Sequence, residues 1–169
     1  MKTTMIRLAL GAWMTAALFG QAKIAILNTQ KALLETSEIK KAQADLEAKY
    51  KPRTDDLRRL DTELADIQSR LSAGTGKLTP QVEADLTGQG QRKQRELQRK
   101  QEDLQAEVER DRQEILMKAS QRMQEVVKKI SEEKGYDVVI DTSNTVHFKV
   151  TLEITTEATA AYDKAYPVK

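Results

Sequence analysis

The chain has 169 residues, with 28 lysines and arginines, 26 aspartates and glutamates, one histidine and no cysteine. This composition excludes disulfide stapling, the usual zinc sites, and catalytic Ser-His-Asp or Cys-His arrangements away from that single histidine. The formal net charge of +2 gives no support to nucleic-acid binding, which needs a strongly basic surface.

The N-terminal segment 1–22 has the pattern of a secretory signal peptide. Two basic residues precede an apolar run of twelve residues from Leu8 to Phe19, and a small-x-small cleavage site ends at Ala22. A retained membrane anchor is the alternative, but a bilayer needs about 20 apolar residues. We therefore predict an exported, cleaved chain that begins at Lys23. Without the two basic residues of the leader, 26 basic residues face 26 acidic ones.

The mature chain is expected to begin with a short strand. The run Lys23-Ile24-Ala25-Ile26-Leu27-Asn28 carries apolar residues on both faces, so both faces need cover. Asn28 is placed to cap a short helix that ends near Leu34, and Thr36 or Ser37 can cap the next helix.

From Ser37 to Lys134 the sequence predicts two long amphipathic helices. In the first, apolar residues repeat at heptad spacing, interrupted only by Gln43 and Arg53, at Ile39, Leu46, Tyr50, Leu57, Leu60, Leu64, Ile67 and Leu71. In the second, they repeat every eleven residues, at Leu97, Leu104, Val108, Ile115, Ala119, Val126 and Ile130. Two such helices should form an antiparallel hairpin, and a helix from Gln91 to Lys134 alone would be about 65 Å long.

The break between the two helices lies at residues 72–80. Gly74 and Gly76 can end the first helix, while Thr79 as N-cap and Pro80 at the first helical position can start the second. A short polar connection of this kind predicts the tip of a hairpin.

Residues that disfavour helix inside the two arms predict bending. Pro52 lies within the heptads, which continue on both sides, so it predicts a kink near Lys49. Gly88 and Gly90 are expected to interrupt the second helix just after it begins. We predict hinges at these three residues and at the two glycines of the break, with segment 72–90 as the most mobile part.

After Gly135 the sequence predicts two further strands. Residues 136–141 and 145–150 are apolar runs rich in valine, separated by a polar turn at 142–144. This pattern predicts a β-hairpin.

A last helix is predicted from Glu157 to Tyr166. Thr155 or Thr156 can cap its start, and Pro167 would stop it.

These elements predict an α+β, mostly helical fold, in which a hairpin arm (37–134) projects from a small β-rich body (23–36 and 135–169). Three short strands make a poor sheet alone and leave edges open, so we predict a homo-oligomer whose strands close around a shared core. The alternative is a monomer in which the last helix covers the sheet. The residues expected at the oligomer interface are Ile24, Ile26, Val138, Ile140 and Val146.

The sequence contains no motif that predicts catalysis. The run Gly74-Thr75-Gly76-Lys77 resembles part of a phosphate-binding loop, but Leu71 and Leu78 stand where that loop requires glycine and Ser/Thr. His147 lies beside Phe148 on a predicted strand, where a surface or sheet-edge role is expected. We therefore predict a non-enzymatic protein without nucleotide, cofactor or metal.

Positive charge gathers near the predicted tip. The basic residues singled out there are Lys77, Arg92, Lys93, Arg95, Arg99 and Lys100. They can form an ordinary solvated helix face, or they can contact an acidic client or an anionic membrane surface. Nucleic acid is disfavoured, because the chain is predicted to be exported and the cluster lacks aromatic side chains for base stacking.

Three pieces of the sequence carry a family resemblance. KIAILN at 23–28 opens the mature chain, YDVVID at 136–141 precedes a turn and Thr145-Val146, and LEITTE at 152–157 precedes the last helix. With the long hairpin between them, they resemble the Skp/OmpH family of periplasmic chaperones over the whole mature chain. Two features depart from the family pattern: the mature chain is neutral where the best-known members are basic, and Glu153 replaces the usual aspartate.

The resemblance implies a homotrimer whose strands form a small barrel-like body and whose three hairpins surround a cavity. It also implies an ATP-independent holdase that shields unfolded outer-membrane proteins in the periplasm between export and insertion. The alternative hypothesis is a structural coiled-coil protein that tethers or spaces components of the cell envelope. Suppressed aggregation of an unfolded barrel protein would favour the first hypothesis, and a single stoichiometric folded partner the second.

Overall fold

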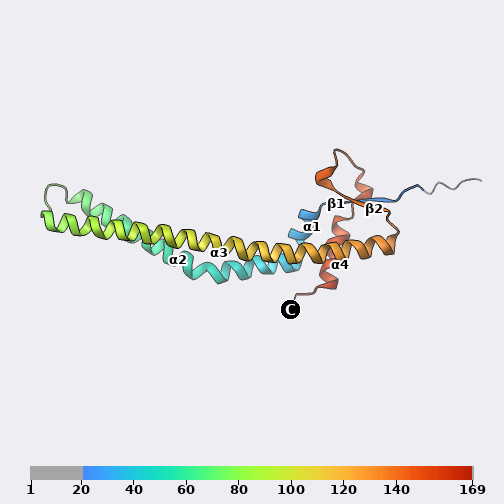
Figure 1. The fold of residues 1–169 in the computed structure, drawn as a ribbon, viewed down its shortest axis with the longest axis horizontal. Coiled ribbons are helices and arrows are strands. Elements are labelled where there is room, and N and C mark those ends of the chain that lie inside the picture. Colours follow the sequence, from blue (N-terminus) through green and yellow to red (C-terminus); the bar gives the residue numbers. More distant parts are fainter. Residues whose placement is uncertain (1–20, 169) are drawn as a thin grey trace, which may run out of the picture.

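The computed structural model of the chain describes residues 21–168. Most of the predicted leader, residues 1–20, lies outside the described residues. Figure 1 shows a long helical hairpin that projects from a small body, where the first and last described residues both lie. The mostly helical α+β fold that we predicted is confirmed.

The hairpin consists of α2 (Ser37–Ala73) and α3 (Pro80–Lys134), which run antiparallel. With 55 residues, α3 is about 80 Å long at about 1.5 Å per residue. In Figure 1, α2 crosses from one side of α3 to the other between the body and the tip. The predicted antiparallel hairpin is therefore present.

The ends of both long helices carry the caps that the sequence predicts. The Thr36 side chain accepts a hydrogen bond from the Ile39 backbone N–H, and α2 ends at Gly74. Thr79 caps α3 and Pro80 stands at its first position. At the other end, Gly135 has φ 68°, the left-handed conformation that glycine adopts without a steric cost.

Both helices continue through the residues that disfavour helix. Pro52 lies inside α2, as predicted. The interruption predicted at Gly88 and Gly90 is wrong, because α3 passes through both without a break. An isolated glycine costs a helix only about 1 kcal/mol, and Gly90 lies where a Cβ atom would be 3.5 Å from Ile67 Cγ2, so this turn packs against α2. The hinge roles of these residues stay a prediction.

The sheet of the body joins strands from opposite ends of the mature chain. β1 (Ile24–Leu27) pairs in parallel with β2 (Val138–Asp141), with Ile24 opposite Val138 and Leu27 opposite Asp141. The predicted hairpin partner at 145–150 is wrong, because these residues form no regular strand. Within the described residues, the sheet has two strands instead of three.

Local hydrogen bonds explain the missing strand. The Asp141 carboxylate accepts from the Ser143 backbone N–H at 2.8 Å, and the Thr145 N–H donates to the Thr142 carbonyl at 3.1 Å. These contacts wind residues 142–144 into a 3-10 turn, and side-chain caps of this kind compete with strand pairing. The chain then returns to the sheet near Glu153, which forms an isolated bridge with Ile26.

Two short helices complete the body. α1 (Thr29–Glu35) follows its N-cap Asn28, whose side chain accepts from the Lys31 N–H as predicted. α4 (Thr155–Ala165) begins earlier than predicted and has no side-chain cap. The expected cap residue Thr155 instead accepts a hydrogen bond from the Asn28 N–H at 3.0 Å, which ties the start of α1 to the start of α4.

The main core lies where the base of the hairpin meets one face of the sheet. Its fully buried members include Ala25 of β1, Ala119 and Met123 of α3, and Ala158 and Tyr162 of α4. Each of the four helices contributes at least one buried residue to it. The base of the arm and the body therefore share one core.

Candidate functional site

Buried apolar residues of α2 and α3 form two clusters. Near the body, Ile39 of α2 packs into the main core with Ala119 and Met123 of α3. Toward the tip there is a second, small cluster, which consists of Leu57, Leu60, Leu64 and Leu97. The heptad and eleven-residue patterns of the sequence therefore do meet in the hairpin, but without one continuous core.

Between the two clusters, polar contacts join the helices. The Asp111 carboxylate accepts from the Lys49 ammonium at 2.5 Å and from the Tyr50 hydroxyl at 2.7 Å, and Arg53 pairs with Glu107 at 2.5 Å. The hydrogen bonds from Lys49 and Tyr50 lower the pKa of Asp111 from 3.8 to about 2. The polar heptad residue Arg53 thus has a partner on α3 that the sequence reasoning had not identified.

Shallow grooves flank this polar stretch of the arm. One groove of about 440 Å³ is lined by Leu46, Ile115 and Lys118, among others. A second groove of about 320 Å³ also includes Leu46, together with Tyr50 and Val108. Both mix apolar and charged side chains.

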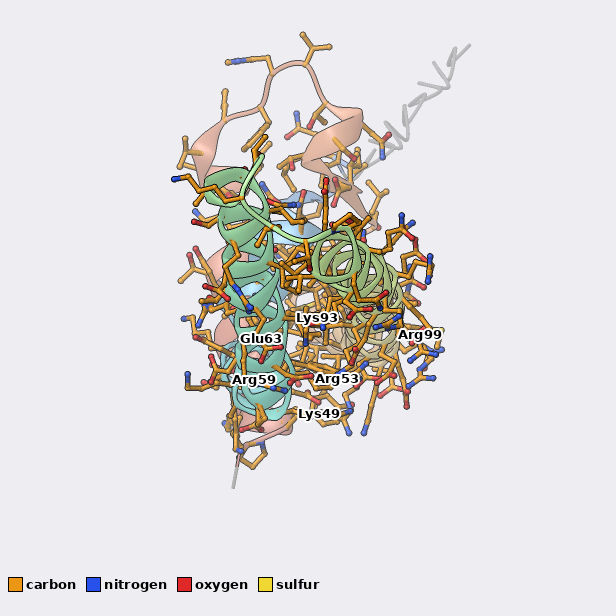
Figure 2. The ribbon with its side chains drawn as sticks, turned by 90° about the vertical axis from the view of Figure 1, so that its left-hand side faces the viewer. Lys49, Arg53, Arg59, Glu63, Lys93 and Arg99 are labelled. Carbon is orange, nitrogen blue, oxygen red and sulfur yellow. The ribbon has the colours of Figure 1, made fainter. Side chains whose placement is uncertain are left out.

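The structure divides the six basic residues predicted near the tip into two groups. Lys93 pairs with Glu63 across the hairpin, and Lys100 pairs with Asp56 at 2.5 Å. Figure 2 views the arm from its tip and shows Glu63 and Lys93 between the two helices. These two lysines therefore hold the hairpin together, which the sequence did not reveal because the register between α2 and α3 was unknown.

The other four basic residues are exposed. Lys77 lies in the tip loop, while Arg92, Arg95 and Arg99 follow one another at spacings of three and four on one face of α3. In Figure 2, Arg99 points away from α2. Among residues 21–168, none of these four forms an ion pair, and Arg92, Arg95 and Arg99 form a positive stripe on the outer side of α3.

The face of the sheet opposite the main core is partly open. Ile24 and Val138, which are direct neighbours across the strands, are 38% and 42% exposed. Ile26 is buried and Ile140 is half-buried on the same face, since side chains alternate along a strand. Val146 lies outside the sheet and is fully exposed on the loop that follows β2. The structure thus brings four of the five predicted interface residues together.

Exposed apolar residues near this face were missed by the sequence reasoning. Val150 is 79% exposed and Leu152 is 37% exposed. Both belong to segment 145–153, which leads back to the bridge between Glu153 and Ile26. Assigning 145–150 to a strand concealed this second apolar surface.

A partly buried polar contact fixes the base of the arm. The Tyr162 hydroxyl of α4 donates to Glu38 of α2 at 2.6 Å, and Arg122 of α3 donates to both oxygens of the same carboxylate at 2.6 and 2.8 Å. Burial would raise the pKa of Glu38, but the hydrogen bonds from Tyr162 and Arg122 lower it overall. Burial, and then the bond to Glu38, raise the pKa of Tyr162. Glu38 therefore stays ionised at neutral pH and joins three helices.

The described residues show neither a metal centre nor a membrane span. Across residues 21–168, no three His, Cys, Asp or Glu side chains gather as a metal ion would require. None of the described helices combines the length and the apolar character needed to cross a bilayer.

Comparisons with known proteins agree with this architecture. The model of the family described as "Outer membrane protein (OmpH-like)" matches residues 23–162. A Skp-like protein from Pseudomonas aeruginosa is 27% identical over 137 residues, which are 81% of this chain and 82% of that protein. A crystal structure from Caulobacter crescentus CB15, described as that of an OmpH-like outer membrane chaperone, matches with a TM-score of 0.70 at 19% identity over 88% of each chain.

Proposed function

Because the chain belongs to the family of OmpH-like outer membrane proteins, we propose that it is an ATP-independent holdase that binds unfolded outer-membrane proteins in the periplasm. The observation that carries this proposal is the hairpin of about 80 Å, which projects beyond the core and has mixed apolar and charged grooves along its flanks. The matched Caulobacter protein is described as an outer membrane chaperone, which supports the same role.

The arm is suited to hold a client without folding it. Grooves that contain Leu46 lie on both flanks, but neither is an enclosed apolar pocket that would select one ligand. Many weak contacts along such a surface keep a client soluble. Release then follows when the client gains better contacts by folding into the membrane, so no nucleotide is needed.

The exposed arginines add attraction at longer range. Arg92, Arg95 and Arg99 give the outer side of α3 a positive stripe, which would draw acidic segments of a client or an anionic membrane surface toward the arm. Salt screens this attraction over about 10 Å at 0.1 M. The contribution of the stripe should therefore weaken as the salt concentration rises.

A single arm cannot enclose a client, so the proposal includes a homo-oligomer, with a trimer as the expected form. The open sheet face with Ile24 and Val138, and the exposed Val146 on the adjoining loop, supply apolar surface for contact between copies. Three arms attached to one shared body would surround a cavity. The predicted leader would direct the chain to the periplasm, where cleavage after Ala22 would release it for assembly.

The proposal is tested by diluting an unfolded outer-membrane barrel protein from denaturant with and without the mature chain. At one trimer per client we expect light scattering to be suppressed, in the absence of ATP. Unchanged scattering would contradict the proposal. Capture of one stoichiometric folded partner, without any suppression, would instead favour the envelope tether.

Variants of the stripe refine this test. Replacing Arg92, Arg95 and Arg99 by glutamine should reduce capture of the unfolded client at low salt, and this reduction should be smaller at high salt. A matched control carries glutamine at three exposed lysines distant from the stripe, Lys31, Lys40 and Lys129. Equal effects of the two triple variants would show that net charge, and not the stripe, is responsible.

A further inference from the structure

The first residue of the predicted mature chain is bound where the arm joins the body. The Lys23 backbone nitrogen donates to Asp137 Oδ2 at 2.6 Å, and the Lys23 carbonyl accepts from the Asp137 N–H at 2.8 Å. The Lys23 ammonium donates to the Lys134 carbonyl at 2.5 Å and lies 5.3 Å from the centre of the Tyr136 ring. Lys23 therefore makes four contacts with residues 134–137, the short segment between the end of α3 and the start of β2.

This segment connects the end of the arm to the sheet of the body. Gly135 ends α3 in the left-handed conformation, and three residues later the chain enters β2 at Val138. The last carbonyl groups of a helix lack partners within the helix and carry partial negative charge. The Lys23 ammonium satisfies one of them at Lys134. Lys23 thus links the end of α3 to the start of the sheet.

Cleavage after Ala22 would change the chemistry of the Lys23 nitrogen. In the uncut chain this nitrogen is a neutral amide with one hydrogen. Hydrolysis of the peptide bond consumes one water, leaves a carboxylate on Ala22, and leaves an amine on Lys23 that takes up a proton at neutral pH. The same 2.6 Å contact with Asp137 then joins two full charges, and such charge-assisted bonds are about twice as strong as neutral ones.

We propose that Asp137 is a binding site for the amino terminus created by processing, so that removal of the leader strengthens the joint between arm and body. This inference rests on the cleaved start included in the proposed function. The match to the family begins at residue 23. Gln21 and Ala22 are exposed, so a chain that retains them can fold in the same way and serve for comparison.

The test compares a chain that begins at Lys23 with one that retains Ala22, at pH 6.5, low salt and equal protein concentration. We expect the added residue to lower the folding equilibrium constant in urea by about two- to five-fold, the range of an exposed ion pair. In the Asp137→Asn background the added residue should have no effect, because no charge is left to pair with. The control Asp45→Asn, on an exposed part of the arm, should retain the full effect.

If retaining Ala22 lowers the folding equilibrium constant equally in the unsubstituted chain and in Asp137→Asn, the proposal is overturned. If Asp137→Asn fails to fold, the comparison at 1 M salt decides, because screening should abolish the difference between the two unsubstituted chains. A difference that persists at 1 M salt would also overturn it. The mass of the exported protein separately reports the start: a start at Lys23 supports the inference, and another start refutes it. Neither the unfolding comparison nor the mass measurement depends on holdase activity.

Discussion

Removal of the Tyr162 hydroxyl tests how the arm is anchored in the body. Tyr162 is fully buried, and its hydroxyl donates to Glu38, which also accepts two hydrogen bonds from Arg122. Tyr166, at the C-terminal end of α4, offers a matched control, because its hydroxyl donates to Glu125 at 2.7 Å in an exposed position. We therefore compare Tyr162→Phe with Tyr166→Phe.

The two substitutions remove the same atom but should differ in cost. A hydrogen bond to a charged group contributes about 1.5–3 kcal/mol, and Tyr162→Phe also leaves the half-buried Glu38 with one partner fewer. The bond of Tyr166 competes with water, so its loss should cost below about 0.5 kcal/mol. We expect Tyr162→Phe to lower the free energy of unfolding by about 2 kcal/mol and Tyr166→Phe to leave it almost unchanged.

Urea unfolding followed by circular dichroism, at one fixed protein concentration, measures both variants. Concentration must be fixed because an oligomer gains stability by mass action. The anchoring role of Tyr162 would be refuted if both variants lost the same stability, or if Tyr162→Phe lost none.

Three further predictions concern the arm and its junction with the body. Leu97→Ala should lower the free energy of unfolding by about 2–5 kcal/mol, because Leu97 is buried in the tip-side cluster, and proteolysis should then cut the arm sooner than the body. Gly135→Ala should lower the free energy of unfolding by about 1–2 kcal/mol, because a φ of 68° strains any other residue. Gly88→Ala, inside α3, should raise it by up to about 1 kcal/mol, and thermal unfolding measures both variants. Asp111 should titrate near pH 2 by NMR, and Lys49→Gln should raise that midpoint toward 3.8. Since the folded pKa is lowered, the contact stabilises above about pH 4 and is lost as pH falls toward 2; an Asp111 midpoint unaffected by Lys49→Gln would exclude this cause.

The sequence was sufficient for the hairpin because local signals determine it. Heptad and eleven-residue spacings define the faces that meet, and Thr36, Thr79 and Pro80 mark the helix ends by chemistry that acts within one turn. The same reasoning overestimated how strongly Gly88 and Gly90 disrupt the second helix. The helix propensity of one residue is small compared with the packing of a 55-residue helix.

The sheet could not be derived in the same way. An apolar run predicts a strand but does not name its partner, and β1 pairs with residues more than a hundred positions away. The polar residues 142–144 predict a hairpin turn, whereas the Asp141 carboxylate caps them as a 3-10 turn. The sequence showed the basic residues of the candidate site. Which of them form ion pairs within residues 21–168, as Lys93 and Lys100 do and the three arginines do not, depends on the register between two helices.

Contact between the arm and an unfolded client can be measured by placing a photo-crosslinking amino acid at single exposed positions. We would place it at Lys118, which lines the 440 Å³ groove, and at Lys164 of α4 in the body as a control. The proposed holdase predicts strong crosslinks to an unfolded barrel protein from Lys118, weak ones from Lys164, and loss of both once the barrel folds into lipid vesicles. Crosslinks from the body alone, or none from the arm, would contradict a chaperone that holds its client with projecting arms.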